Sequence, residues 1–324
     1  MQLARQLASR QIRPALRALQ QQLQQPARST FLGSQLRMLG PLACVPSRAF
    51  SGSDVASPPP MRRHLSGMAA TPNAEPLREL QGVQEAVEVI DALPAIQTKL
   101  LLTCEHASLR LPEPWQWPSG DNRLLGMHWS FDAGAEEFTR ELSKRLPSVA
   151  VLARFSRLLC DANRPIGADT MFRKEADGKP VLLNSNLEED EIQRRLDALY
   201  HPYHRALKHA AEVVKPSLVL SIHSFTPEYE GQPRTVELGV LYKHEKDRAL
   251  ADKFLSAYAA LGIKVAVNEP WSAKDGFAYS ADQFNSLSCA SIMLELRQDL
   301  AVQQEWRLKV LQATIEVLNE AGHK

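Results

Sequence analysis

The chain has 324 residues, of which 44% are hydrophobic and 23% charged, and this ordinary globular composition suits one large domain or two small ones. The net charge of +1 hides an asymmetry, because residues 1–50 contain seven arginines and no acid, whereas the rest holds 31 basic and 37 acidic side chains. A mildly acidic body argues against nucleic acid as a partner. No apolar run approaches the ~20 residues that span a bilayer, so no membrane partner is predicted. Widely spaced cysteines without a CxxC pair favour a reducing compartment.

The first eighty residues have the composition of a targeting segment and a linker. Residues 1–25 combine leucines near helical spacing with arginines and no acid, which is typical of a mitochondrial transit peptide. The stretch SRAFSGS at 47–53 resembles a processing site, and residues 51–76 are too rich in Ser, Pro and Ala to bury a core. We therefore predict an organellar transit peptide and disordered linker over residues 1–80, directed to the mitochondrial matrix. A chloroplast address and a basic nucleic-acid-binding arm are the alternatives.

From about residue 80 onward, short apolar runs alternate with stretches of helical periodicity. The apolar runs, which predict buried strands, lie at 98–106, 148–155, 217–223, 236–243, 263–269 and 290–297. The helical stretches lie at 132–146, 188–214, 246–262 and 303–322. This alternation predicts one catalytic-sized domain over residues 81–324, a three-layer α/β/α fold with a mixed, mostly parallel central sheet.

Two histidines stand where predicted strands end, which is where open α/β sheets carry their sites. His106 closes one apolar run and His223 another. Each alone could be a core residue with a satisfied hydrogen bond, but together they suit a zinc site, which typically uses two histidines and a carboxylate. Glu105 is adjacent to the first histidine, yet successive strand side chains point to opposite faces. Asp132, at the start of a predicted helix, is the better geometric guess for the third ligand, and both acids remain open.

A carboxylate lies inside the last predicted strand. Glu295 has apolar residues on both sides, and an unpaired buried carboxylate is costly. One interpretation is a salt bridge to Arg297 or another arginine. The other is a general base that takes a proton from zinc-activated water and passes it to a leaving amine.

The stretch DANRP suggests an anion-binding element. The guanidinium of Arg164 can bind a carboxylate through two parallel hydrogen bonds, and the adjacent amide of Asn163 can share the same anion. A structural turn is the alternative, because Pro165 disfavours helix at the preceding residue and Asp161 could pair with Arg164.

Six motifs in this order resemble the N-formylglutamate amidohydrolase family, a distant branch of the zinc carboxypeptidase and aspartoacylase-like hydrolases. They are EHAS (105–108), DAGA (132–135), SRLLCDANRP (156–165), HPYHRAL (201–207), SIHSF (221–225) and LELR (294–297). The resemblance covers nearly all of residues 98–300, and the SRLLCDANRP string is its most specific part. The HxxE pair of carboxypeptidases is missing, since Leu109 stands three residues after His106. The chain also reads CEHAS where better-known members read proline–histidine–serine–glycine, which places it in a divergent branch.

The resemblance implies a zinc-peptidase-like fold and a role for each matching residue. The implied zinc ligands are His106, His223 and, provisionally, Asp132. The implied general acid/base is Glu295, and the implied substrate-carboxylate ligands are Asn163, Arg164 and Arg157. The implied pocket-lining residues are His204 and the 268–279 loop with Tyr279.

The sequence as a whole therefore predicts a zinc-dependent amidohydrolase. It would use zinc-activated water to cleave the amide of a small N-acylated amino acid such as N-formylglutamate. Zinc is favoured because mixed nitrogen and oxygen ligands suit it, although other divalent ions can occupy such sites. The alternatives are a carboxypeptidase-like or aspartoacylase-like hydrolase, and a non-catalytic protein that uses Arg164 to bind a carboxylated metabolite.

Overall fold

The computed structural model describes residues 82–91 and 98–323. The transit peptide and linker predicted for residues 1–80 lie outside the described residues. In the part that is described, no helix is long and apolar enough to cross a membrane.

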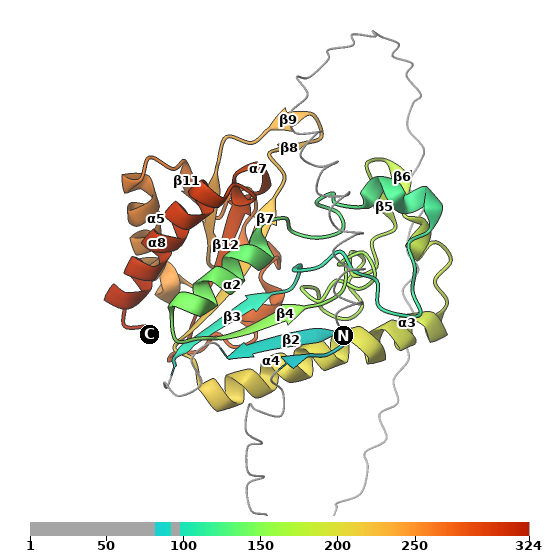
Figure 1. Cartoon of the computed structure of the whole chain (residues 1–324), viewed down its shortest axis with the longest axis horizontal. Helices are drawn as coiled ribbons and strands as arrows, with labels where there is room; N and C mark the ends of the chain where they lie inside the picture. The colour runs from blue at the N-terminus through green and yellow to red at the C-terminus, as the bar shows by residue number, and fades with distance from the viewer. Residues whose placement is uncertain (1–81, 92–97, 324) are drawn as a thin grey trace, which may run out of the picture. The chain divides into compact units, whose positions relative to one another are not determined.

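An eight-stranded mixed sheet forms the centre of the fold (Figure 1). In spatial order its strands are β1 (Gly82–Val83), β2 (Val87–Asp91), β4 (Val149–Ala153), β3 (Leu100–Cys104), β7 (Leu218–Phe225), β12 (Ala290–Arg297), β10 (Leu238–Leu241) and β11 (Val265–Val267). The four central strands, β4, β3, β7 and β12, run parallel to one another. β2 is antiparallel to β4, and β10 is antiparallel to β12, while β11 runs parallel to β10. This confirms the predicted α/β fold with a mixed, mostly parallel sheet.

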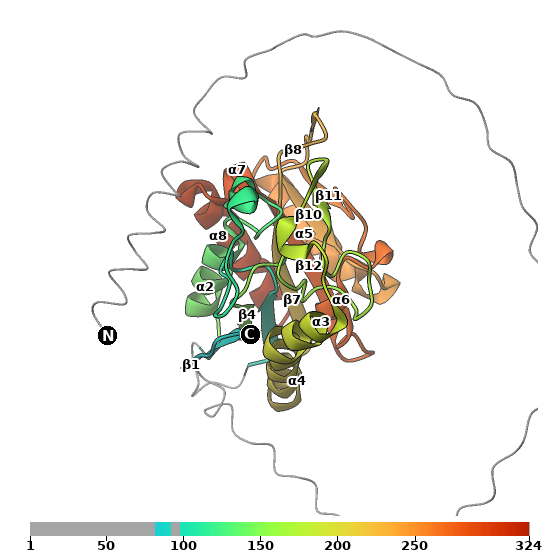
Figure 2. The ribbon, with the colours of Figure 1, turned by 90° about the vertical axis from the view of Figure 1, so that its right-hand side faces the viewer.

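Helices cover both faces of the sheet because the central strands are apolar on both sides. Along β3, Leu101 packs into the cluster that contains α4 (His201–Val214), whereas Leu100 and Leu102 pack into the opposite cluster. That opposite cluster contains α2 (Ala135–Arg145), α5 (Arg248–Ala260) and α8 (Gln304–Glu320). Figure 2 shows α4 on one side of the strands and α2 and α8 on the other. These are the three layers that the sequence predicts.

The predicted helix at 188–214 is helical throughout but changes its winding. It comprises α3 (Glu189–Arg195), a π-helical stretch at Leu196–Tyr200, and α4. Single π turns often mark functional positions. Here the π stretch ends at Tyr200, whose hydroxyl donates to the carbonyl oxygen of Arg164 at 3.0 Å. The helix is thereby tied to the DANRP segment.

Several short elements are too brief to leave a periodic pattern in the sequence and were not predicted. Two are hairpins, β5 (Glu175–Ala176) with β6 (Lys179–Pro180), and β8 (Glu228–Tyr229) with β9 (Gln232–Pro233). The others are α6 (Tyr279–Asp282), α7 (Gln298–Ala301) and 3-10 turns at Ser119–Leu124, Leu182–Asn184, Glu245–Asp247 and Ala273–Asp275. In Figure 1 the β8–β9 hairpin lies at the top and the β5–β6 hairpin at the right. β8 begins three residues after the end of β7, so that hairpin lies next to the carboxyl edge of the central strands.

Candidate active site

Three ligand-type side chains converge at the carboxyl ends of β3 and β7. His106 follows β3, His223 lies on β7, and Asp132 precedes α2. The Nδ1 atoms of the two imidazoles are 3.1 Å apart, and Asp132 Oδ2 lies 3.2 Å from the first and 2.9 Å from the second. All three side chains are buried. This group could hold a metal ion.

Local backbone features fix Asp132 in this triangle. Its own N–H donates to the carbonyl oxygen of His106 at 3.0 Å, and its Oδ2 also accepts from the N–H of Ser224 at 3.2 Å. Gly134 has a φ of 85°, and a Cβ there would lie 2.6 Å from the Cβ of Ala301 in α7. Only glycine therefore lets the DAGA turn approach α7, and this requirement explains the motif.

Each imidazole has a carboxylate on its outer nitrogen. Asp161 Oδ1 lies 2.8 Å from His106 Nε2, and Glu105 Oε2 lies 2.9 Å from His223 Nε2. Such carboxylates hold the proton on Nε2 and leave the lone pair on Nδ1. Two such nitrogens 3.1 Å apart beside a carboxylate oxygen can share a divalent cation or, in its absence, a proton. A tetrahedral zinc ion with bonds of about 2.0–2.1 Å separates its ligands by about 3.3 Å, so the residues fit a divalent ion of this size.

The pKa values of these groups respond to the same contacts. Burial alone would lower the pKa of His223, but its hydrogen bonds to Asp132 and Glu105 raise it to about 10. Burial opposes ionisation of Glu105, yet the hydrogen bond from His223 lowers its pKa to about 2. The pKa of Asp132 is also lowered, because both imidazoles outweigh its burial. Without a metal, a proton on His223 therefore supplies the positive charge that the carboxylates attract.

Glu105, the alternative third ligand, lies behind His223 rather than beside the Nδ1 atoms. Its Oε2 accepts from Ser221 Oγ at 3.1 Å as well as from His223, and its Oε1 accepts from the hydroxyl of Tyr203 on α4 at 3.0 Å. β3 ends at Cys104, so Glu105 is the first residue of the turn that leads to His106. The acid with an oxygen next to both Nδ1 atoms is Asp132.

Arg157 joins the acids of the cluster. Its NH2 lies 3.1 Å from Asp161 Oδ2, and its NH1 lies 3.4 Å from Asp132 Oδ1. The DANRP segment does form a turn, in which the N–H of Arg164 donates to the carbonyl oxygen of Asp161 at 3.2 Å, but the Asp161 side chain pairs with Arg157 and not with Arg164. Arg157, which was predicted to bind substrate, instead directs NH1 and NH2 at these two carboxylates.

Glu295 lies beside the cluster because strand register places it there. It is the Cα partner of His223 across the parallel β7–β12 pair. Its Oε1 accepts from Trp271 Nε1 at 3.1 Å, whereas its buried Oε2 has no partner among the described residues. Burial raises its pKa to about 8. The salt bridge to Arg297 is not formed, since that arginine pairs with Asp299 at 2.8 Å.

Gly239 makes room for the loop that carries Trp271. On β10 it is the Cα partner of Glu295. A Cβ at this position would lie 2.1 Å from the carbonyl oxygen of Glu269 and 3.2 Å from the Cβ of Glu295. The 268–279 loop can therefore lie against β10 only because residue 239 is glycine.

Asn163 anchors the other end of this loop. Its Nδ2 donates to the carbonyl oxygen of Phe277 at 2.7 Å, and its Oδ1 accepts from the N–H of Ser280 at 3.0 Å. The amide that was predicted to bind substrate thus makes two backbone hydrogen bonds that position the loop.

Two further predicted pocket residues make local contacts. His204 Nε2 lies 3.0 Å from the carbonyl oxygen of Ala162, and the hydroxyl of Tyr200 lies 3.4 Å from that of Tyr279. The rings of His204 and Tyr279 are 6.0 Å apart. These contacts join α4 to the end of the loop rather than to the His–Asp–His group.

Arg164 retains free donors. Its NH1 donates to the carbonyl oxygen of Asn163 at 2.8 Å, its Nε donates to Thr170 Oγ1 at 3.1 Å, and its guanidinium stacks over Phe277 at 5.1 Å. No carboxylate among the described residues forms an ion pair with it. A carboxylate ligand could therefore bind to its remaining N–H groups.

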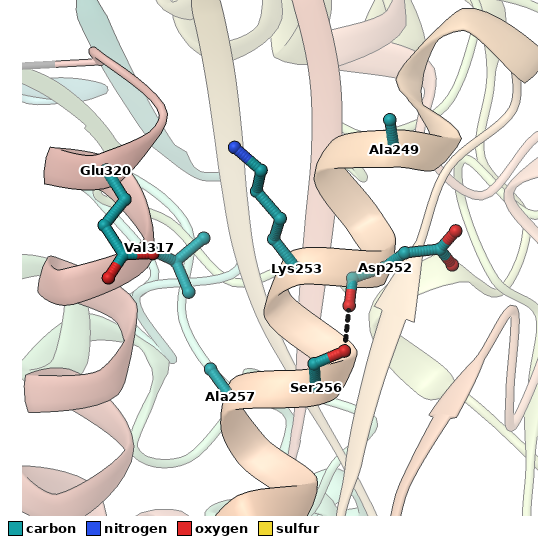
Figure 3. A pocket seen from close by; sticks show the side chains of 7 residues that line it. All are labelled: Ala249, Asp252, Lys253, Ser256, Ala257, Val317 and Glu320. Atoms are coloured by element: carbon teal, nitrogen blue, oxygen red, sulfur yellow. Dashed lines mark hydrogen bonds between the residues drawn. The ribbon is translucent and has the colours of Figure 1, made fainter.

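A groove between α5 and α8, about 490 Å³ in volume, offers no comparable chemistry (Figure 3). It is lined by Ala249, Asp252, Lys253, Ser256, Ala257, Val317 and Glu320. Its residues belong to helices of the layer opposite α4, whereas Glu105 of the site contacts α4. The candidate active site is therefore the carboxyl edge of β3, β7 and β12.

Comparison with solved structures shows proteins of similar fold. Gene product Atu2144 from Agrobacterium tumefaciens is 30% identical, with a TM-score of 0.66 over 74% of this chain and 95% of that chain. The N-formylglutamate amidohydrolase from Ralstonia eutropha has the same fold at 18% identity, with a TM-score of 0.58 over 73% of this chain and 98% of that chain. No curated protein sequence matches the chain.

Fold and site together define a three-layer α/β/α protein with a candidate metal centre at the carboxyl edge of its sheet. A family model described as N-formylglutamate amidohydrolase matches residues 98–302. The chain belongs to the N-formylglutamate amidohydrolase family, as the order of its motifs predicts. Membership supports amidohydrolase activity on a small-molecule amide.

Proposed function

We propose that this protein is a zinc-dependent amidohydrolase that cleaves the amide of a small N-acylated amino acid, in the manner of N-formylglutamate deformylation. One observation carries the proposal. Two imidazole Nδ1 atoms and one carboxylate oxygen lie 2.9–3.2 Å apart, next to a buried carboxylate with one unpaired oxygen. This arrangement combines a metal-binding triangle with a group that can move a proton.

His106, His223 and Asp132 would hold the ion. When bound, a divalent ion such as zinc lowers the pKa of water and polarises a substrate carbonyl. Asp161 and Glu105 keep the Nδ1 lone pairs of the two imidazoles directed at the centre of the triangle.

Glu295 would accept a proton from the attacking water at Oε2 and return it to the nitrogen of the leaving amine. Trp271 holds Oε1, so Oε2 remains the free oxygen. A pKa raised to about 8 by burial suits a group that must both take and give a proton near neutral pH.

Arg164 would bind the carboxylate of the amino-acid half through its free N–H groups. Asn163 would act by holding the backbone at Phe277 and Ser280, and Arg157 by holding Asp132 and Asp161. These two residues are positioning residues in this scheme, and Arg164 is the substrate ligand.

The test is the Glu295→Gln variant with N-formylglutamate as substrate. We expect turnover to fall by roughly 10²- to 10⁴-fold, the usual worth of general acid–base catalysis, with zinc content unchanged by elemental analysis. Full activity in this variant refutes the mechanism.

Two other results point to the alternative functions. Activity on peptide C-termini in place of N-acyl amino acids indicates a carboxypeptidase-like enzyme, whereas a preference for N-acylaspartate over N-formylglutamate indicates an aspartoacylase-like one. Less than about a tenth of an equivalent of zinc, with no gain on reconstitution, indicates a carboxylate-binding protein, because a catalytic site of this kind needs its ion.

A further inference from the structure

Arg234 is a partly buried arginine near the site that lacks an acidic partner. It follows β9, and no carboxylate among the described residues forms an ion pair with it. Several partly or fully buried arginines of the described residues pair with an acid, for example Arg195 with Glu191 at 2.8 Å and Arg307 with Glu141 at 3.2 Å. Arg164, like Arg234, does not. Burying a guanidinium without a counter-charge is costly. An anion from outside the chain could supply the counter-charge that Arg234 lacks.

Aromatic rings hold the Arg234 guanidinium in place. It lies 5.7 Å from the ring centre of Phe225, 5.0 Å from that of Tyr229 and 5.2 Å from that of Trp271. Its NH1 also donates to the carbonyl oxygen of Thr226 at 3.3 Å. Stacking uses the faces of a guanidinium and leaves N–H groups at its edge, where a carboxylate binds bidentately. Arg234 is thus pre-organised for an anion.

Arg234 and Arg164 stand at the two ends of one row of rings. Arg164 stacks over Phe277 at 5.1 Å, and the ring of Phe277 lies 5.8 Å from that of Trp271. Trp271 in turn stacks with Arg234. We call these four residues the Arg164–Arg234 row.

The proton-transfer group lies at the middle of this row. Trp271, an inner member of the row, donates to Glu295 Oε1 at 3.1 Å. A scissile amide must sit next to Glu295 for the proton to reach its nitrogen. Along the row, Arg164 and Arg234 lie on either side of Trp271, the residue that holds the proton-transfer group.

We propose that Arg234 binds a second anionic group of the substrate, on the opposite side of the scissile amide from the carboxylate at Arg164. This rests on the proposed function and narrows it, because the preferred acyl half then carries an acidic group of its own. A formyl group has none, whereas a dicarboxylic acyl group does. Hydrolysis forms a C–O bond from water and breaks the C–N bond. Both water protons end on the leaving amine, which gives a dicarboxylate and an ammonium.

The experiment uses N-acylglutamates whose acyl group is formyl, malonyl, succinyl or glutaryl. Each dicarboxylic member is paired with its terminal carboxamide, which keeps the shape and removes the charge. With the zinc-loaded protein, we expect kcat/KM for the best carboxylate to exceed that for its carboxamide by about 10- to 100-fold, as for a lost charge-assisted hydrogen bond. Arg234→Met should bring that ratio close to one, because the charge of the acyl group then no longer has a partner at residue 234.

The matched control is Arg194→Met. Arg194 also stacks over a tryptophan, Trp115 at 5.3 Å, but it lies on α3 and pairs with Glu191. It should keep the wild-type ratio. A wild-type ratio near one, or a ratio that survives Arg234→Met, overturns the inference.

Failure of the proposed function gives a different result. If no member of the panel is hydrolysed, the amidohydrolase proposal falls. Calorimetric binding of the same carboxylate and carboxamide pairs to wild type and Arg234→Met then decides the role of Arg234 separately. If Arg234→Met does not fold, Arg234→Lys replaces it, since it keeps the charge but not the planar fork and should retain part of the preference. Equal affinity of wild type for both members of every pair refutes an anion site at Arg234.

Discussion

Substitution of the two carboxylates behind the imidazoles should lower metal affinity by unequal amounts. Loss of such an outer partner typically weakens metal binding by 10- to 100-fold, or about 1.4 to 2.7 kcal/mol. Asp161→Asn and Glu105→Gln each remove one negative charge but preserve size. The groups around the two acids differ in whether they can accept a hydrogen bond from the NH₂ group of the new amide.

The surroundings of Asp161 contain only donors. Oδ1 receives His106 Nε2 and the N–H of Asn163, and Oδ2 receives Arg157. In either orientation of an asparagine side chain, its NH₂ group would face one of these donors and repel it. We therefore expect Asp161→Asn to reach the 100-fold end of the range, about 2.7 kcal/mol.

The surroundings of Glu105 are more adaptable. The hydroxyl of Tyr203 next to Oε1 can reverse and accept from a glutamine NH₂, while the amide oxygen still accepts from His223 and Ser221. We expect Glu105→Gln to lose nearer 10-fold, about 1.4 kcal/mol. Competition with a chromophoric zinc chelator at pH 7.5 measures both values. Wild-type affinity in Asp161→Asn, or a larger loss in Glu105→Gln, refutes this account.

Four further outcomes are expected. Excess zinc at a thousand times its Kd should stabilise the protein by about 4 kcal/mol in urea unfolding, and this gain should vanish in His106→Ala. Burial raises the pKa of Glu295 from its ordinary 4.5 to about 8, so the metal-free fold binds more protons than the unfolded chain in that window and loses stability as pH rises. Glu295→Gln should remove this pH-dependent loss. The prediction is contradicted if the difference in unfolding free energy between variant and wild type does not change between pH 5 and pH 8. Gly239→Ala should cost about 1–3 kcal/mol by displacing the loop, with activity falling as well; unchanged activity refutes its role. A reporter fused to residues 1–60 should enter mitochondria, and diffuse cytosolic signal would reject that address.

The central strands could be predicted because their local pattern is strong. β7 and β12 are buried along nearly their whole length, so each is a continuous apolar run bounded by polar residues. β2 was missed, since its five residues alternate in burial and include two acids. The antiparallel pairings of β2 and β10 could not be predicted either, because strand direction depends on long-range contacts and not on local sequence pattern.

The site was predictable where strand ends mark it and not where distant segments meet. His106, His223 and Glu295 could be found because each interrupts or closes an apolar run. Asp161 reaches His106 across 55 positions, and Trp271 reaches Glu295 across 24. No spacing rule connects such residues, although an unexplained acid two positions before NR was a usable signal for Asp161.

Asn163 shows how a correct location can come with a different contact. The DANRP segment does lie beside the site, but the Asn163 amide bonds to backbone at Phe277 and Ser280. Residue type alone cannot tell a ligand-binding amide from one that binds its own chain. Arg234, in contrast, was not predicted at all, because nothing in the stretch GQPRT indicates that three aromatic rings surround its guanidinium.

Proton-transfer geometry and substrate preference depend on different parts of the fold, so one could change without the other. The spacing between His223 and Glu295 is fixed by backbone hydrogen bonds in the middle of the sheet, the part of a protein that exchanges its amide hydrogens last. Arg234 and Trp271 come instead from a surface hairpin and a loop, which tolerate insertion and replacement. Exchange of the β8–β9 hairpin between homologues should therefore transfer substrate preference while the proton-transfer geometry stays unchanged.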